Sequence, residues 1–122
     1  MKNLFSVILL LISASSFANP IGKTGNDILH ECSLLLDANK IDTSSKIMTA
    51  GHCLGYLNGL NDMAIVWQAM EKVNHYCLPK NGLEGGQLVR VIIEGLKSRP
   101  SELHESARVS FLLIMKENFP CN

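Results

Sequence analysis

Four cysteines limit the folds available to this chain of 122 residues more than any other feature. They are Cys32, Cys53, Cys77 and Cys121. No two of them have the CxxC spacing, and no histidine lies at zinc-finger spacing from a cysteine, so a structural zinc site has little support. In an exported chain an even number of cysteines predicts two disulfides. The compartment in which the chain folds therefore decides what these cysteines do.

The N-terminus indicates that compartment. Lys2 precedes an apolar run over residues 4–12, and Ser16-Phe17-Ala18 places small residues where a signal peptidase cleaves. This order is typical of a secretory signal peptide, and we expect cleavage after Ala18. An uncleaved membrane anchor is the alternative, but the apolar run is too short for a membrane-spanning helix. We therefore expect a soluble, exported chain in an oxidising environment.

Removal of residues 1–18 leaves 104 residues, 19–122, which is enough for one domain. Ten basic side chains then face eleven acidic ones, so the mature chain is nearly neutral. A neutral surface is unsuited to nucleic acid or to anionic lipid, because both are bound through their negative charge. A domain of this size buries only about 60–68% of its unfolded surface, so two disulfides would add needed stability.

Apolar residues recur at helical spacing, and no segment alternates with the period of a strand. The sequence therefore predicts an all-α fold, a small bundle of four or more helices cross-linked by two disulfides. The predicted helices run from Asn26 or Asp27 to about Ala38, from a cap at Ser44 or Ser45 towards Val73, from Gln87 to about Lys97, and from Pro100 to about Phe119.

The long second helix carries two stripes of residues. One stripe is mostly apolar, and the opposite one consists of Gly51, Gly55 and Gly59. Glycine costs a helix about 0.8–1 kcal/mol relative to alanine, so three glycines need a compensating gain. We expect the backbone of a neighbouring helix to approach them, which would make this the central helix. A kink near Gly59 is a further option. A transmembrane dimer motif is disfavoured by the polar Asn58, Asn61 and Asp62.

Four cysteines allow three pairings, and the predicted helices favour one of them. The first two helices are joined by a short connection and should pack antiparallel, which brings Cys32 near Cys53. Cys77 precedes the third helix and Cys121 follows the fourth, so these two lie at the same end of a second helical hairpin. We expect Cys32–Cys53 and Cys77–Cys121, with the other two pairings open.

The residue types needed for catalysis occur without the spacing that catalysis requires. The four histidines are scattered, with no HExxH, and no GxSxG surrounds a serine. Gly82, Gly85 and Gly86 lack the strand and lysine of a phosphate-binding loop. Asp62 as a buried catalytic acid is an alternative to a structural or solvated Asp62. We expect no enzyme, no cofactor and no metal site.

An ordered set of short motifs extends from Cys53 to Cys121. It comprises Cys53-Leu54-Gly55-Tyr56-Leu57-Asn58-Gly59 with Asp62, Cys77-Leu78-Pro79, Gln87-Leu88-Val89, Arg99-Pro100 with Leu103-His104 and Ala107, and Phe119-Pro120-Cys121. This set resembles the Rap/Tai family of small exported bacterial proteins, the type VI secretion amidase-immunity proteins. The resemblance implies an all-helical periplasmic domain, often a homodimer, that covers the catalytic cleft of a peptidoglycan amidase and has no enzymatic role.

The matched motifs do not fix the surface that contacts the partner. Loops on a rigid scaffold are where binding residues concentrate, so we expect contact through the loop before the third helix. The candidate partner-binding residues are His75, Tyr76, Lys80, Asn81 and Glu84. Two alternatives to the immunity function are an orphan periplasmic protein of the same fold and a small acid-stress chaperone.

Overall fold

The structure, a computed structural model, describes residues 22–122. The predicted signal peptide and its cleavage site lie outside the described residues. Within them the chain forms α-helices and 3₁₀ turns, and no strand, which confirms the all-α prediction. The elements are α2 (Gly25–Ser33), η1 (Leu34–Leu36), η2 (Ala38–Lys40), α3 (Ser44–Glu71), α4 (Gly85–Lys97), η3 (Pro100–Glu102) and α5 (Ala107–Asn118).

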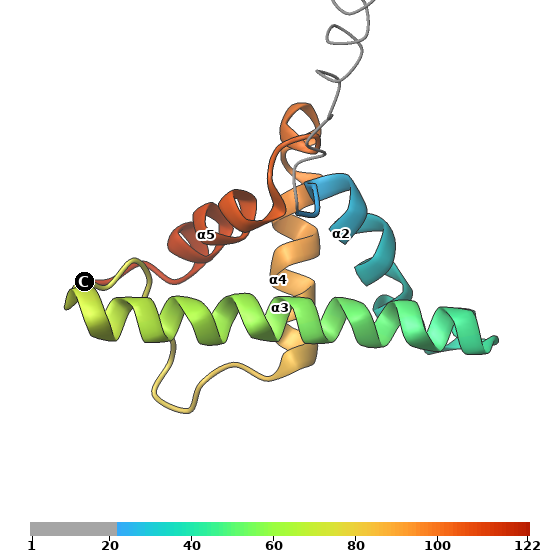
Figure 1. Ribbon diagram of the computed structural model, residues 1–122, viewed down its shortest axis with the longest axis horizontal. Coiled ribbons are helices and arrows are strands. Elements are labelled where there is room, and N and C mark those ends of the chain that lie inside the picture. The colour runs from blue at the N-terminus through green and yellow to red at the C-terminus, as the bar shows by residue number, and fades with distance from the viewer. Residues whose placement is uncertain (1–21) are drawn as a thin grey trace, which may run out of the picture.

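Helix α4 lies at the centre of the fold. Figure 1 shows α3 along the longest dimension of the molecule, with α4 crossing it steeply and α2 and α5 on either side of α4. Helix α4 packs against all three of the other helices. Its buried residues are Leu88, Val89, Ile92, Ile93 and Leu96. The expectation that α3 is the central helix is wrong, because α3 uses only one face within the described chain.

The glycines of α3 are open rather than packed. A Cβ atom added at Gly51, Gly55 or Gly59 would meet nothing within 4 Å, so no helix of the described chain approaches them. The close approach occurs at Gly95 instead, where an added Cβ would lie 2.6 Å from Ile114 Cγ1 and Cγ2. The expectation of a helix against the glycine stripe is therefore wrong for the single chain. Helix α3 runs through Gly59 without a break.

Local hydrogen bonds help to determine where the first helix, α2, begins and ends. Helix α2 begins at Gly25 because Thr24 and Asp27 form a reciprocal capping box. It ends at Ser33, where the chain tightens into the 3₁₀ turn η1. Helical structure does not continue to Ala38 without a break, because Asp37 is extended and its side chain accepts from the N–H of Asn39.

The long helix α3 begins and ends within one or two residues of the predicted positions. Thr43, not Ser44 or Ser45, caps it, with Oγ1 accepting from the N–H of Lys46 at 3.3 Å. The helix ends at Glu71, two residues before the predicted Val73, because Lys72 adopts the left-handed conformation with φ 56°.

The last helix begins later than predicted. Pro100 starts only a 3₁₀ turn, and α5 begins at Ala107. Between them the backbone bonds to the start of α2, with Asn26 N–H donating to Leu103 O at 2.8 Å and Ala107 N–H donating to Lys23 O at 2.8 Å. These bonds take the backbone groups that a longer α5 would have used.

The disulfide prediction is confirmed. Cys32–Cys53 joins α2 to α3 across 21 residues, and Cys77–Cys121 joins the α3–α4 connection to the end of the chain across 44. Both sulfurs of the first bridge lie in residues that are 0% exposed. Cys77 and Cys121 are exposed. One disulfide therefore belongs to the core and the other to the surface.

Two kinds of feature are absent from residues 22–122. None of the helices there is both long enough and apolar enough to span a bilayer. No cluster of three or more histidine, cysteine, aspartate or glutamate side chains in that range is arranged to hold a metal ion.

Candidate functional site

The candidate site is the connection between α3 and α4, residues 72–84. It contains the five residues that the sequence selected. The left-handed Lys72 turns the chain back at the end of α3. Beyond this turn, the connection is fastened to the domain at its base and exposed at its tip.

A buried side chain of α3 holds the base of this loop. Gln68 is 9% exposed, and its Oε1 atom accepts from the backbone N–H of His75 at 2.7 Å and of Tyr76 at 3.1 Å. One side-chain oxygen therefore accepts hydrogen bonds from two backbone N–H groups that lose contact with water when the chain folds. The loop begins at a fixed distance from α3.

Tyr76 is a core residue, so the expectation that it is exposed for partner contact is wrong. It is 2% exposed, and its hydroxyl donates to Asn61 Oδ1 at 2.9 Å. Its ring meets that of Phe111 edge-on, with centroids 6.5 Å apart. Burial, with a smaller effect of the Asp62 charge, raises the pKa of Tyr76 to about 12. Tyr76 therefore anchors the loop instead of offering a contact.

His75 is half-buried beside Trp67. The two ring centroids are 4.5 Å apart, and the planes are tilted by 31°. The Nε2 atom of His75 is buried and has no hydrogen-bond partner. Trp67 remains 44% exposed, so the Trp67–His75 pair lies at the surface, where the loop contacts α3.

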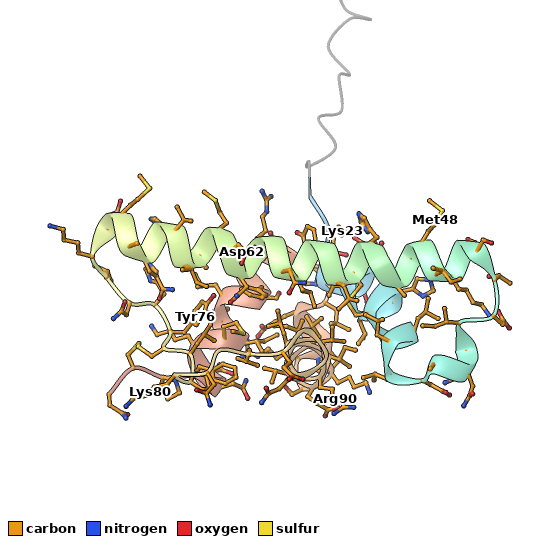
Figure 2. All side chains as sticks on the ribbon, turned by 90° about the horizontal axis from the view of Figure 1, so that it is seen from below. Lys23, Met48, Asp62, Tyr76, Lys80 and Arg90 are labelled. Carbon is orange, nitrogen blue, oxygen red and sulfur yellow. A yellow bond between two sulfur atoms is a disulfide. The ribbon has the colours of Figure 1, made fainter. Side chains whose placement is uncertain are left out.

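The tip of the loop carries the remaining candidates. Lys80, Asn81 and Glu84 are exposed. Gly82, with φ 73°, donates its N–H to Pro79 O at 2.8 Å and closes the turn that presents them. Figure 2 shows Lys80 near the edge of the molecule, farther from α3 than Tyr76. The tip offers a cation, an amide and a carboxylate, which suits recognition of a polar surface.

The loop is also fastened at the next residue, Cys77. Cys77 donates its N–H to Phe119 O at 2.8 Å and is bonded to Cys121. The end of the chain therefore holds the loop through one hydrogen bond and one covalent bond. This arrangement fixes the base of the loop relative to the rest of the domain.

Sequence reasoning missed a second surface, which we call the outer face of α3. It consists of Met48, Gly51, His52, Gly55, Gly59, Asp62, Met63, Val66 and Met70, all exposed. Met48, Met63 and Met70 are 76%, 66% and 75% exposed. The sequence signal was present, because Asp62 is the only Asp, Glu, Lys or Arg between Lys46 and Glu71.

Comparison with known protein families gives a match over nearly all the described chain. Residues 24–121 match the family model of the Rap1a immunity proteins. The chain belongs to the Rap1a immunity protein family. This match agrees with the Rap/Tai resemblance and covers all four described α-helices and both disulfides. No curated protein and no solved structure matches the chain. Membership in the Rap1a family indicates an immunity protein directed against a secreted toxin.

Proposed function

We propose that this Rap1a immunity protein binds a type VI secretion peptidoglycan amidase in the periplasm and occludes its active site. The producing cell is thereby protected from the amidase. The observation that carries the proposal is the 72–84 loop, exposed at Lys80, Asn81 and Glu84 and fastened at its base. An inhibitor that fills a catalytic cleft needs such a protruding segment.

The fastening of the loop supports tight binding. Association costs free energy for every segment that becomes ordered at the interface. Gln68 and the Cys77–Cys121 bridge hold residues 75–77, at the start of the loop, before any partner arrives. The loop therefore enters a cleft with less ordering cost than a free segment of the same sequence.

The remaining parts of the proposal concern delivery and assembly. Residues 1–18 act as a signal peptide that is cleaved after Ala18, and export brings the four cysteines to an oxidising compartment. The mature protein works by binding, without enzymatic activity, cofactor, nucleic acid or membrane. It forms a homodimer.

The first experiment mixes oxidised protein, residues 19–122, with candidate type VI amidases and measures binding and peptidoglycan cleavage. We expect binding together with loss of cleavage. Lys80→Glu should weaken binding roughly tenfold or more, as expected for a contact worth about 1.4 kcal/mol. Lys97→Glu changes another exposed lysine, at the end of α4; it serves as the matched control and should bind as the unmodified protein does.

Three outcomes separate the parts of this proposal. Inhibition that survives charge reversal at both Lys80 and Glu84 would move the contact away from the loop. Binding without loss of cleavage would contradict occlusion. Failure to bind any amidase would favour an orphan member of the family or an acid-stress chaperone, which a client-aggregation assay at low pH distinguishes.

A further inference from the structure

The outer face of α3 lies directly opposite the buried face of the same helix. Its midline follows steps of four and three residues, through Met48, His52, Gly55, Gly59, Asp62 and Val66. These steps are those of a helix seam that meets another helix. Figure 2 shows the other described helices on one side of α3, with Met48 on the opposite side.

This face lacks the charge of an ordinary surface helix. A helix with one side in water normally carries charged residues on that side. Here the exposed side has Asp62 as its only charged residue between Lys46 and Glu71, with Met48 76% and Met63 66% exposed. The three glycines leave the helix backbone open to a partner, since nothing lies within 4 Å of an added Cβ. Such a face suits contact with another helix.

The residue pattern selects a second copy of this chain as that partner. The glycines lie in the middle of the face, and the large apolar residues Met48 and Val66 lie at the two ends of its midline. If two copies lie antiparallel with Gly55 opposite Gly59, then Met48 of each copy meets Val66 of the other. A parallel pair would instead place methionine on methionine and Asp62 on Asp62. The face is therefore complementary to itself in one direction only.

The polar residues of the face agree with the same register. Antiparallel pairing about Gly55 and Gly59 brings His52 of each copy opposite Asp62 of the other. His52 Nδ1 lies 3.0 Å from Glu31 Oε2, so the contact with Asp62 uses the other ring nitrogen, Nε2. Within a helix seam, a polar pair of this kind specifies direction and register.

We propose that the outer face of α3 binds the same face of a second copy, antiparallel, with the two helices crossing at Gly55 and Gly59. This inference rests on the homodimer in the proposed function and assigns its surface and register. The interface is isologous, so each contact occurs twice.

The size of the contact sets the expected strength. At about 1.5 Å per residue the seam from Met48 to Val66 is roughly 27 Å long, and a helix with side chains is about 10 Å wide. The pair thus buries a few hundred Å² per copy, at the low end for specific interfaces. We expect a dimer that dissociates on dilution.

The experiment measures sedimentation equilibrium of residues 19–122 over a wide concentration range, without any amidase. Gly55→Glu should weaken dimerisation roughly 100-fold or more, because it puts two unpaired charges into the contact. The single chain has room for this side chain, and glutamate favours helix over glycine, so the unfolding midpoint should not fall. The matched control is Gly86→Glu on α4, where an added Cβ also meets nothing within 4 Å.

A distance measurement tests the register. A spin label on Met48→Cys, attached after the native disulfides have formed, should lie roughly 27 Å along the helix axis from its copy in the antiparallel pair. A parallel pair would bring the labels to about 10 Å. That short distance, unchanged dimerisation of Gly55→Glu, or a monomer at every concentration would overturn the proposal. Since no amidase is present, each result is independent of the toxin-binding test.

Discussion

The α4–α5 contact and the outer face of α3 both place glycine within a helix, in opposite surroundings. At Gly95 an added Cβ would lie 2.6 Å from two carbons of Ile114, whereas at Gly55 it would meet nothing within 4 Å. The first glycine is required by the chain's own packing. The second is not. Glycine spacing thus indicates that close approach is needed, without telling whether the approaching helix belongs to the same molecule.

The largest effect should come from the disulfides, one in the interior and one on the surface. Cys32→Ala with Cys53→Ala should lower the free energy of unfolding by roughly 3–5 kcal/mol. The unfolded chain gains conformational entropy when the cross-link is removed, and the folded chain loses the packing of two buried side chains. Cys77→Ala with Cys121→Ala should cost less, because those two residues are exposed. Urea unfolding followed by circular dichroism measures both. An equal or larger loss at the exposed bridge would contradict the distinction between interior and surface.

Gly95→Ala should lower the free energy of unfolding by roughly 1–3 kcal/mol despite the better helix propensity of alanine. The new methyl group would collide with Ile114 Cγ1 and Cγ2, which lie too near the backbone to swing aside. Ile114→Val in the same chain should recover part of the loss. Urea unfolding of the two variants tests this, and a stabilised Gly95→Ala would show that α4 and α5 are not in close contact there.

Gln68→Met should lower the free energy of unfolding by roughly 1–2 kcal/mol, because two backbone donors lose their acceptor. Hydrogen exchange at His75 and Tyr76 should accelerate with it, and binding to the amidase should weaken. Gln87→Met, at an exposed position of α4, is the control and should change neither property. Slow exchange retained at both amides would rule out Gln68 as the anchor.

The smallest effect has the opposite sign. Gly55→Ala should raise the free energy of unfolding of the monomer by about 1 kcal/mol through helix propensity alone. Thermal unfolding at concentrations where the protein is monomeric measures this gain. The same change should weaken the dimer, since it adds a methyl group at the crossing point. If the monomer of this variant is more stable and its dimer dissociation constant is unchanged, then Gly55 does not lie in the proposed contact.

Much of the fold could be predicted because it depends on local periodicity. Helical spacing of apolar residues located every α-helix within the described chain, and the order of the helices selected the correct disulfides. The ends were less predictable. Leu103 and Ala107 form backbone bonds with the start of α2, and those bonds depend on residues about 80 positions earlier.

The candidate site was predicted in part. The loop position could be inferred from its turn residues, and Lys80, Asn81 and Glu84 are exposed as expected. The burial of Tyr76 could not be read from the sequence, because it depends on Asn61 and Gln68 facing the loop from one side of α3. The outer face of α3 was missed because its glycines were assigned to packing within the chain.

The order of the cysteines along the chain has a consequence for how the protein is made. Each bridge joins consecutive cysteines, Cys32 with Cys53 and Cys77 with Cys121. A chain that enters an oxidising compartment from its N-terminus presents Cys32 and Cys53 before the other two cysteines arrive. Pairing in order of arrival then yields the native bridges directly. If the chain is exported as proposed, we therefore expect its maturation to require an oxidant of thiols and no disulfide isomerase.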